Sequence, residues 1–366
     1  MKELAILGIR GVPAAHGGFE TFAEKLSLYL VEKGWRVTVY CQVDGKGEIS
    51  TDTWKGVQRV NIPVSRGGAA GTVIFDWKAT WHAARHHKLT LTLGYNTALF
   101  CTLLRIRGVV NLINMDGIEW QRDKWSGAER AWLYINERAG CWLGNHLIAD
   151  HPKIEKHLQT RVSGRKITMI PYGAEEILSA DVSLLEPLGV SPGGFALVIA
   201  RPEPENSILE IVRAFSRKPR SRRLVVLGNF DTGNNPYHAR VRQAASDEVV
   251  FPGAIYDKPV LAALRFYTLL YIHGHTVGGT NPSLVEALGA GSPVLAHDNG
   301  YNRWVAGEGA AFFADEDECA DTMDGLLHDP DTTQRMRQAS RDQFVRSFQW
   351  KSILQSYQNL FLASAP

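Results

Sequence analysis

Short apolar runs alternate along the chain with longer stretches in which apolar residues recur at every third or fourth position. Residues 3–9, ELAILGI, form the first run, and residues 19–34 follow with helical spacing that ends at Gly34. Residues 35–42, WRVTVYCQ, form the next run. This succession predicts a β-loop-α-β unit, and therefore a parallel sheet covered by helices.

The same alternation continues through the first half of the chain and then begins again. Residues 175–194 separate the halves and suit a linker, while residues 343–361 suit one amphipathic C-terminal helix. We therefore expect an α/β protein with two Rossmann-like parallel-sheet domains. The further apolar runs are residues 88–94, 108–117, 145–150, 165–176, 193–200, 221–229, 249–255, 269–274 and 292–298.

Length and composition agree with a two-domain globular protein. The chain has 366 residues, of which 45% are hydrophobic and 21% charged, and its net charge of +2 gives no reason to expect a nucleic-acid partner. The N-terminal residues do not form a signal peptide, and no apolar stretch is long enough to span a bilayer. Four well-separated cysteines predict buried thiols in a reducing cytoplasm.

The most informative stretch is HTVGGTNPSLVEALGAG, residues 275–291, which follows an apolar run. Gly278 and Gly279 allow backbone N–H groups to face a ligand, and Pro282 suits the first turn of a helix. Free N–H groups and the helix dipole favour an anion such as phosphate, and Glu286, one turn inside, can accept hydrogen bonds from ribose hydroxyls. A glycine-rich turn before an ordinary capped helix is the alternative interpretation.

Two further strand-to-helix connections carry candidate binding groups. Arg201 directly follows residues 195–200, so its guanidinium would lie at the carboxyl end of a strand and could hold two phosphate oxygens. A surface ion pair with Glu203 or Glu205 is the alternative. Residues 8–26 also join a strand to a helix through glycines, but they do not form the dinucleotide fingerprint GxGxxG.

Within residues 8–26, Gly17 and Gly18 could bring backbone donors to a diphosphate. Glu20 and Thr21 lie at the start of the helix that follows, where we expect them to act as caps. The next strand ends in Tyr-Cys-Gln, without the acid that would hold the ribose of NAD. These features argue against an NAD-binding oxidoreductase.

Asp116 follows the apolar run at residues 109–114 and precedes a glycine, so we expect it at a strand end. A carboxylate there can contact a sugar hydroxyl, whereas a turn-forming Asp-Gly pair is the alternative. Glu119 and Arg122, just beyond it, fit a local ion pair equally well.

Three other patterns have simpler explanations. The acidic run at residues 315–317 matches a D-x-D metal motif but precedes a helical pattern, so we expect N-capping. His82, His86 and His87 lack a second cluster of ligands, and with neighbouring Lys and Arg they indicate a basic helix face, either solvated or resting on an anionic membrane. Residues 213–223 hold six basic residues and no acid, and we expect a solvated loop there.

Taken together and in this order, several stretches resemble the GT-B retaining glycosyltransferases of family 4, and within them a bacterial polysaccharide, rhamnosyltransferase-like, DUF1972-type subgroup. The resemblance spans nearly the whole chain. It is carried by GIRGVPAAHGGFETFAE, NMDGIEW, IPYGAE, ARPEPEN and HTVGGTNPSLVEALGAGSPVLAHDN.

The resemblance implies a GT-B fold: an acceptor-binding domain at residues 1–176, a nucleotide-sugar-binding domain at 177–345 and a C-terminal helix at 346–366 that returns to the first domain, with a cleft between the domains. It implies that Arg201 and Asp116 act in catalysis, with no metal or cofactor. The donor-binding positions that it implies are Gly17, Gly18, Arg201, Asn206, Gly278, Gly279, Thr280, Asn281 and Glu286. The acceptor-side candidates are His16, Glu20, Tyr95, Asn96 and Glu119.

This chain departs from the wider family at two of these positions. Gly278 stands where the family has the first acid of an E-x7-E pair, and Asn206 stands where it has a lysine. In the family, the acid contacts hydroxyl groups of the sugar, and the lysine adds positive charge near the phosphates. This chain lacks both side chains. Both forms are typical of the polysaccharide subgroup.

The expected reaction is the transfer of a sugar from a nucleoside-diphosphate sugar to a saccharide acceptor, with retention. Subgroup resemblance favours dTDP-rhamnose, a lipid-linked acceptor, a role in exopolysaccharide, capsule or O-antigen synthesis, and a cytoplasmic protein peripheral to the membrane. A GT-B-fold UDP-sugar epimerase and a non-catalytic sugar-nucleotide binder are the alternatives.

Overall fold

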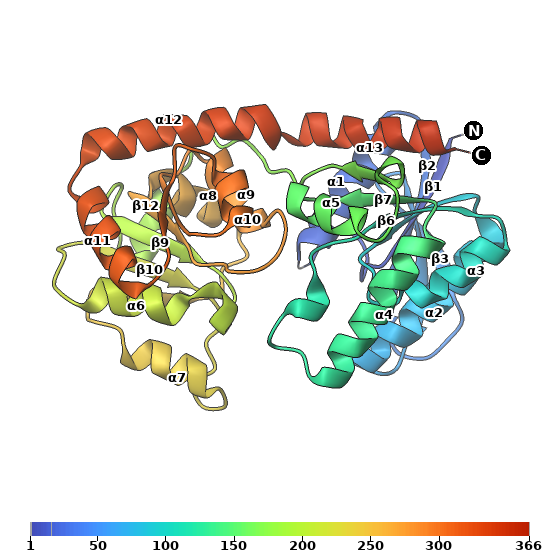
Figure 1. Ribbon diagram of the computed structural model, residues 1–366, viewed down its shortest axis with the longest axis horizontal. Coiled ribbons are helices and arrows are strands. Elements are labelled where there is room, and N and C mark those ends of the chain that lie inside the picture. The colour runs from blue at the N-terminus through green and yellow to red at the C-terminus, as the bar shows by residue number, and fades with distance from the viewer. Residues whose placement is uncertain (1, 16, 366) are drawn as a thin grey trace. The chain divides into compact units, whose positions relative to one another are not determined.

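The computed structural model describes residues 2–15 and 17–365 and divides the chain into two compact units. The first unit comprises Met1–Pro171 with Lys351–Pro366, and the second comprises Tyr172–Trp350 (Figure 1). Each unit has its own parallel sheet between helices, so the rhythm of two βα series in the sequence corresponds to two separate folding units.

The sheet of the first unit has the strand order β3-β4-β2-β1-β5-β6-β7-β8, and its neighbouring strands are parallel except for β3 and β4. The order reverses at β1, so right-handed crossovers place α1 on one face and α2, α3 and α4 on the other. The strands are β1 (Glu3–Leu7), β2 (Arg36–Asp44), β3 (Ser50–Trp54), β4 (Val57–Val64), β5 (Leu89–Leu93), β6 (Val110–Asn114), β7 (His146–Ala149) and β8 (Ile167–Met169).

The helices of this unit follow its strands in the alternation that the sequence predicts. They are α1 (Gly18–Glu32), α2 (Gly68–His86), α3 (Thr102–Ile106), α4 (Gly127–Leu143), α5 (Pro152–Gln159) and α13 (Trp350–Ser364). Short 3-10 turns lie at η1 (Ala98–Cys101), η2 (Glu119–Gln121) and η3 (Gly164–Lys166).

The hairpin formed by β3 and β4 is an element that the apolar runs did not predict. β3 is polar and almost entirely exposed at the edge of the sheet, so it carries no apolar run. β4 buries alternate residues, which is the period of a half-buried strand. Lys55 and Gly56 both have positive φ, at 48° and 82°, as a tight hairpin turn requires.

The sheet of the second unit has the order β11-β10-β9-β12-β13-β14, with every neighbouring pair parallel. Its strands are β9 (Phe195–Ile199), β10 (Arg223–Leu227), β11 (Val249–Gly253), β12 (Leu270–His273), β13 (Val294–His297) and β14 (Ala311–Phe313). Its helices are α6 (Ile208–Ser216), α7 (Pro236–Gln243), α8 (Lys258–Tyr267), α9 (Pro282–Gly289), α10 (Gly300–Ala306), α11 (Glu316–Leu327) and α12 (Pro330–Ser347).

This second sheet is buried on both faces, which explains why its strands are continuous apolar runs. Ala196 and Val198 of β9 contribute to the core under α6 and α11, and Phe195 and Leu197 contribute to the core under α8, α9 and α12. The sheet is therefore a fixed base from which the loops at its carboxyl edge project.

Residues 175–194 are not a free linker, in contrast to the sequence interpretation. They hold the 3-10 segment η4 (Val182–Leu188), whose Leu185 is buried in the second unit's core. The Tyr267 hydroxyl donates to the Ala180 carbonyl at 2.8 Å, and the Gly193 N–H donates to the Tyr267 carbonyl at 2.9 Å. The stretch is therefore packed against α8.

The single C-terminal helix predicted at residues 343–361 is also wrong, because two helices meet within it. α12 ends at Ser347 and α13 begins at Trp350. The Phe348 carbonyl accepts a hydrogen bond from the Ala174 N–H at 3.0 Å, and Gln349 forms a β-bridge with Ala174. The backbone leaves the helix at these two residues because it pairs with another segment.

Two simpler predictions concern the thiols and membrane-spanning segments. Cys41, Cys101, Cys141 and Cys319 are buried free thiols, as the sequence predicts. Within residues 2–15 and 17–365, no helix has the length and apolarity needed to cross a bilayer.

Candidate functional site

The carboxyl edge of the second sheet gathers the most distinctive residues of that unit. The strand order reverses between β9 and β12, and ligands of open α/β folds bind at such switch points. Arg201 and Asn206 lie in the loop after β9, and residues 274–281 form the loop after β12. Two stretches about 75 residues apart in sequence therefore meet, since the Thr276 N–H donates to the Glu205 carbonyl at 2.9 Å.

The start of α9 has the local structure that its sequence predicts. The Asn281 side chain caps the helix by accepting from the Ser283 N–H at 3.0 Å, and Pro282 occupies the first turn. Gly278 has φ of 123°, which a residue with a side chain rarely adopts. The N-terminus of α9, with its positive dipole end, therefore faces the loop that the glycines shape.

His275 is the residue of this loop that sequence analysis missed. It is 9% exposed, and its Nδ1 donates to Asn206 Oδ1 at 2.6 Å. A Cβ at Gly278 would lie 3.0 Å from His275 Nε2. Asn206 also donates through Nδ2 to the Arg201 carbonyl at 2.8 Å, so Asn206 bonds the His275 ring while Gly278 lies beside it.

Arg201 is exposed, and within the part of the chain that the structure describes its guanidinium forms no ion pair. The alternative in which Glu203 or Glu205 neutralises it is therefore wrong. Its backbone, by contrast, is held by the bond from Asn206. The chain thus keeps a positive charge uncompensated at the carboxyl edge of β9.

Glu286 has a partner within the protein. Its carboxylate forms an ion pair with the guanidinium of Arg265 on α8, which is buried, whereas the Glu286 side chain is 35% exposed. The sequence did not predict this role of Arg265, because the helical pattern of α8 indicates only which face of the helix is apolar. The exposed side of the Glu286 carboxylate remains accessible to a ligand, and its orientation is set by Arg265.

In the first unit, the loop after β1 leads into α1 without a side-chain cap. Gly17 occupies the N-cap position with φ of 89°, so the expected capping by Glu20 and Thr21 is wrong. The Thr21 hydroxyl instead donates to the Gly17 carbonyl at 3.1 Å. Among the described residues, no side chain caps the first turn of α1, which begins at the switch point beside β1. His16 lies outside the described residues.

Asp116 follows β6 on the same edge of the first sheet, with φ of 52°. Its N–H donates to Asn114 Oδ1 at 3.1 Å, and Asn114 Nδ2 donates to the Tyr357 hydroxyl of α13 at 2.9 Å. Burial, with a further contribution from the Glu119 charge, raises the pKa of Asp116 to about 6. A left-handed backbone and a raised carboxyl pKa at a strand end are typical of a functional position.

The other acceptor-side candidates lie around Asp116. The Tyr95 hydroxyl accepts from the Glu119 N–H at 2.7 Å, and Glu119 forms the expected ion pair with Arg122 at 2.5 Å. The Asn96 carbonyl accepts from the Trp132 indole at 2.8 Å. The structure thus brings Tyr95, Glu119 and Asp116 together and commits the Glu119 carboxylate to Arg122.

A buried acid that the sequence did not single out supports this region. Glu137 of α4 is 1% exposed and accepts from the Trp120 indole at 2.7 Å. It also pairs with His157 at 3.0 Å and Arg161 at 3.3 Å, and these hydrogen bonds lower its pKa despite burial. Glu137 therefore ties the segment after Asp116 to α5 and the residues that follow it.

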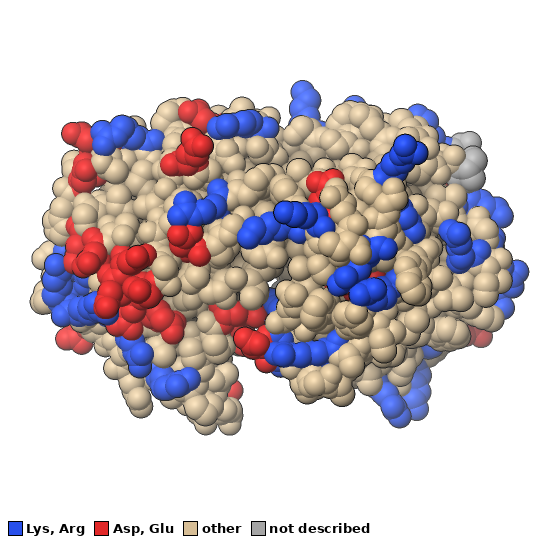
Figure 2. Space-filling model, in the orientation of Figure 1, with Lys and Arg blue, Asp and Glu red and all other residues tan. Residues whose placement is uncertain are grey.

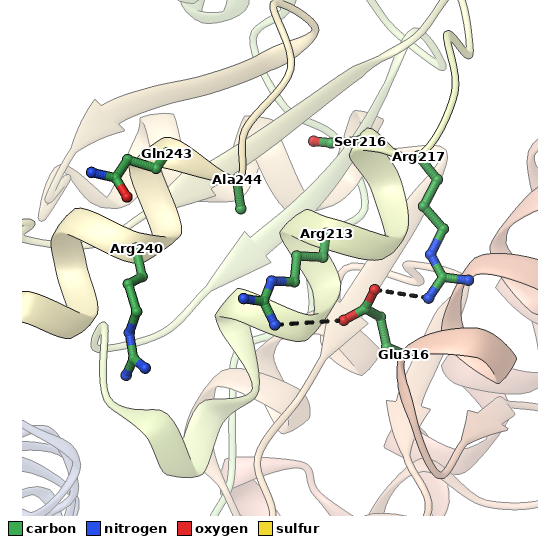
Figure 3. A pocket seen from close by; sticks show the side chains of 7 residues that line it. All are labelled: Arg213, Ser216, Arg217, Arg240, Gln243, Ala244 and Glu316. Atoms are coloured by element: carbon green, nitrogen blue, oxygen red, sulfur yellow. Dashed lines mark hydrogen bonds and ion pairs between the residues drawn. The ribbon is translucent and has the colours of Figure 1, made fainter.

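The pocket in Figure 3 lies elsewhere on the second unit and does not belong to this site. It is lined by residues at the ends of α6 and α7 and by Glu316 at the start of α11, and none of the predicted donor-binding residues lines it. Glu316 accepts from Arg217 at 2.7 Å and lies 4.0 Å from Arg213 (Figure 3).

The basic stretch at residues 213–223 is a solvated loop only in part: residues 213–216 belong to α6, Arg223 begins β10, and residues 217–222 are an exposed loop except for Arg220. Besides the pairs with Glu316, Lys218 and Arg220 pair with Asp324 at 2.8 and 2.9 Å, and Arg220 is buried. Four of its six positive charges, those of Arg213, Arg217, Lys218 and Arg220, are paired with acids of α11, which the local sequence could not show.

The patterns that resemble metal motifs have other roles. Asp315 caps α11 by accepting from the Glu318 N–H at 2.9 Å, as predicted. His82 bonds the Tyr40 hydroxyl at 2.8 Å and stacks on His86. Among the described residues, no group of three or more His, Cys, Asp or Glu side chains is arranged to hold a metal ion.

Comparison with protein-family models divides the chain as the fold does. Residues 1–175 match the family described as "Domain of unknown function (DUF1972)". Residues 209–359 match the family described as "Glycosyl transferase-like". No curated protein is significantly similar in sequence.

Several solved structures share the whole fold at low sequence identity. Sucrose-phosphate synthase from Thermosynechococcus elongatus superposes with a TM-score of 0.80 at 19% identity, covering 100% of both chains. HepE of Anabaena in complex with UDP-glucose gives 0.76 at 16% identity, covering 99% of this chain and 100% of that one. A UDP-forming α,α-trehalose-phosphate synthase of Burkholderia xenovorans, in complex with glucose-6-phosphate, gives 0.72 at 12% identity, covering 99% and 100%.

These similarities define the class of protein. The chain has the GT-B fold, built from two Rossmann-like α/β domains. Its second half carries a glycosyltransferase-like domain, and the predicted donor-binding positions from Arg201 to Glu286 lie at the carboxyl edge of that domain's sheet.

Proposed function

We propose that this protein transfers a sugar from a nucleoside-diphosphate sugar to a hydroxyl group of a saccharide acceptor, with retention of configuration. The observation that carries the proposal is that the loop of Arg201 and Asn206 meets the loop at residues 274–281 at the switch point of the second sheet, through the Glu205–Thr276 and Asn206–His275 hydrogen bonds. A cation without an ionic partner, glycine-shaped backbone and a helix N-terminus form a site for a diphosphate.

Arg201 and the N-terminus of α9 would act mainly on the leaving group. As the sugar–phosphate bond breaks, negative charge accumulates on the diphosphate oxygens. Arg201, the backbone N–H groups of Gly279 to Asn281 and the dipole of α9 would stabilise that charge without moving. Gly17 and Gly18, at the start of α1, would serve as backbone donors to a phosphate group.

Glu286 would hold the ribose. Arg265 fixes its carboxylate, and the exposed carboxylate oxygen can accept from the two ribose hydroxyls. This role differs from the charge stabilisation by Arg201, because ribose binding is equally strong before and during the reaction.

His275 would replace the acid that the wider family has at the position of Gly278. Its Nδ1 bonds Asn206 Oδ1, and its Nε2 lies on the side of Gly278, where a Cβ would come within 3.0 Å of it. We assign His275 to the hydroxyl groups of the transferred sugar. Thr280, which is buried in the same loop, would help to shape that pocket.

Asp116 would act on the acceptor side. In a retaining reaction of this type, the acceptor hydroxyl attacks the face from which the diphosphate leaves, and a phosphate oxygen takes the acceptor proton. The ionised Asp116 carboxylate would stabilise the positive charge that develops on the sugar ring. Tyr95, Asn96, Glu119 and Glu20 would form the surroundings of the acceptor, and the mechanism uses no metal or other cofactor.

The identity of the substrates follows from the resemblance to family 4 and its polysaccharide subgroup. We propose dTDP-rhamnose as the donor and a lipid-linked saccharide as the acceptor, in bacterial exopolysaccharide, capsule or O-antigen synthesis. The protein would then act in the cytoplasm at the membrane surface.

The proposal is tested by screening nucleoside-diphosphate sugars for thermal stabilisation and then measuring acceptor-dependent release of the nucleoside diphosphate. Arg201→Ala is expected to reduce kcat by about 10²–10³-fold, as the loss of one charge-stabilising donor does elsewhere. Because Arg201 is exposed, the melting temperature of the Arg201→Ala variant should equal that of the unaltered protein. Arg222→Ala, an exposed arginine after α6, is the control.

Full activity of Arg201→Ala would show that Arg201 does not stabilise the diphosphate leaving group. Interconversion of UDP-sugars without an acceptor would favour a GT-B-fold epimerase, which shares the diphosphate site. Donor binding without turnover of any sugar would favour a non-catalytic binder.

A further inference from the structure

One face of the first unit exposes an unusual number of large aromatic and aliphatic side chains. Every exposed tryptophan within the described residues lies on α2 or α4. Trp142 is 67% exposed, and Ile106 of α3 is 75% exposed. The exposed large side chains of this face are Trp77, Trp81, Leu99, Ile106, Trp132, Tyr134, Ile135 and Trp142, and we call it the aromatic face.

The aromatic face follows from helical periodicity on two helices. Trp77, Trp81 and Arg85 recur at every fourth residue of α2, and Trp132, Ile135 and Trp142 recur at spacings of three and seven along α4. Such positions share one side of a helix. The opposite side of α2, which includes Phe75 and Ala79, is buried in the core, so the exposed stripe is additional to the apolar side that folding requires.

The two stripes are joined by η1. Trp77 meets Phe100 of η1 edge to face, with ring centroids 5.2 Å apart. The Leu99 N–H donates to Asn136 Oδ1 of α4 at 3.0 Å, and α3 packs against α2. The face is therefore one continuous surface across α2, η1, α3 and α4.

The exposed charges on this surface are mainly positive. Lys78, Arg85, Arg105 and Arg107 are exposed on α2, α3 and the residue after α3. Of the acids on these helices, Glu129 at the start of α4 is exposed. The Asp76 carboxylate accepts from the Thr97 hydroxyl at 2.8 Å, and Glu137 is buried. Arg85 lies over the Trp81 ring, 4.1 Å from its centroid.

The whole first unit shares this charge. It holds 24 Lys and Arg against 15 Asp and Glu, a net charge of +9, whereas the second unit holds 16 against 23, a net charge of −7. The near-neutral total had hidden this asymmetry. On the side drawn in Figure 2, acidic side chains gather near α11 of the second unit, and basic side chains prevail over the first.

A groove of about 430 Å³ opens beside the α2 stripe. Trp77 and Trp81 line its apolar part, and Lys78, Arg85 and His86 line its basic part. Apolar rings next to cationic groups match the boundary between acyl chains and anionic headgroups.

We propose that the aromatic face docks this protein on an anionic phospholipid bilayer. Tryptophan and tyrosine favour the level of the headgroups, and each nearby Lys or Arg adds electrostatic attraction to an anionic surface. A second copy of the chain is disfavoured as the occupant because two faces of a unit with a charge of +9 repel each other.

The position of the face fits its use in the reaction. Trp132 donates to the Asn96 carbonyl, so the face adjoins the acceptor-side residues Asn96 and Tyr95. A lipid-linked saccharide held in the same bilayer would enter the acceptor side from this direction. This part of the inference rests on the proposed function, whereas binding to the bilayer itself does not.

The test is sedimentation of the full chain with vesicles of phosphatidylcholine, with and without phosphatidylglycerol. We expect binding only with the anionic lipid, together with a blue shift of tryptophan fluorescence and quenching by brominated acyl chains. Each of Arg85→Glu, Arg105→Glu and Arg107→Glu should lower the partition coefficient at least about fivefold, which corresponds to about 1 kcal/mol per basic residue. Raising the salt concentration should weaken binding.

Trp142→Ser and Ile106→Ser should each weaken binding severalfold. Tyr256→Ser and Leu178→Ser, which are 69% and 68% exposed on the second unit, are the matched controls and should bind as the unaltered protein does. The proposal would be overturned if the control variants lost as much vesicle binding as Trp142→Ser and Ile106→Ser. Binding that does not depend on anionic lipid would also overturn it. A solution dimer that Trp142→Ser separates would overturn it in favour of a second copy of the chain.

Failure of this inference can be told from failure of the proposed function. If vesicles do not bind but acceptor-dependent release of nucleoside diphosphate is observed with a soluble acceptor, the docking proposal fails and the function stands. If vesicles bind and no sugar is transferred, the function fails and the docking proposal stands.

Discussion

At the scale of single residues, the loop after β12 is organised around His275. Asn206 orients the ring through Nδ1, and Gly278 leaves space beside Nε2. Two positions that looked like losses relative to the wider family are thus parts of one arrangement. In the proposed site, a hydrogen-bonded histidine takes the place of a lysine and an acid, and Arg201 would provide the positive charge for the phosphates.

Glu286 is expected to affect both stability and binding. Glu286→Ala leaves the buried Arg265 guanidinium without its carboxylate, which should lower the free energy of unfolding by roughly 1–3 kcal/mol. Urea unfolding measures this change, and Glu308→Ala, an exposed acid of the same unit, is the control.

Glu286→Gln separates the two roles because the amide oxygen can still accept from Arg265. We expect it to recover most of the stability while weakening nucleotide binding measured by calorimetry. Unchanged nucleotide affinity in this variant would remove Glu286 from the ribose site.

Asp116 is expected to make stability depend on pH. Burial and the Glu119 charge raise the pKa of its carboxyl from 3.8 to about 6 in the folded protein. The folded state therefore holds this proton more tightly than the unfolded state, and the stability that this provides is complete below pH 3.8 and is lost as the pH rises through about 6. Urea unfolding of Asp116→Asn across this range should show the variant gaining relative to the unaltered protein as the pH rises.

The control for this effect is Asp123→Asn, because the Asp123 side chain is fully exposed. Its stability relative to the unaltered protein should stay constant over the same range. The proposed role of the Asp116 carboxylate also predicts that kcat/KM rises as the pH passes through about 6. A rise that persists in Asp116→Asn would assign it to another group.

At the scale of elements, α13 completes the first unit although it comes from the far end of the chain. Tyr357 packs on Phe22 of α1 with ring centroids 4.7 Å apart, and Phe361 meets Trp35 at 6.1 Å. The Tyr357 hydroxyl also holds Asn114, whose side chain accepts from the Asp116 N–H. This helix therefore supports both the core of the unit and the backbone at the candidate site.

Phe361→Ala should destabilise the first unit strongly, since the ring is fully buried. We expect a loss of about 3–5 kcal/mol in the free energy of unfolding. Leu362→Ala, one residue further on α13 but 42% exposed, should change it by less than about 0.5 kcal/mol. Equal effects of the two substitutions in chemical unfolding would contradict the packing described for α13.

At the scale of the whole molecule, the chain joins two units of opposite net charge with separate cores. Each unit can therefore have its own unfolding transition. Arg201 and Glu286, the residues proposed to bind the nucleotide, belong to the second unit.

Scanning calorimetry of the full chain should show that a nucleoside diphosphate raises the transition of the second unit. The expected stabilisation is about 2.7 kcal/mol when the ligand is present at 100 times Kd. Phe361→Ala identifies the transition of the first unit, and Phe344→Ala, in the core under α12, identifies that of the second. If the ligand raised the transition that Phe361→Ala lowers, the nucleotide would belong to the first unit.

The sequence by itself determined the two βα series, most of the strands and the helix start at Asn281–Pro282, because these depend on short-range periodicity and local capping. It did not predict the β3–β4 hairpin, since an exposed edge strand needs no apolar run. It also placed one helix where the backbone of Phe348 and Gln349 pairs with Ala174.

Only the tertiary structure decided which side chains meet. His275 with Asn206, Glu286 with Arg265, Asn114 with Tyr357, and the aromatic stripes of α2 and α4 each join residues from different elements. Local periodicity shows which side of a helix is apolar, but not which element covers it. Composition gave a net charge of +2, whereas the division of the chain into two units separates it into +9 and −7. The net charge of a chain does not record where the charged residues lie. Their location in the fold determines which partner a surface can attract.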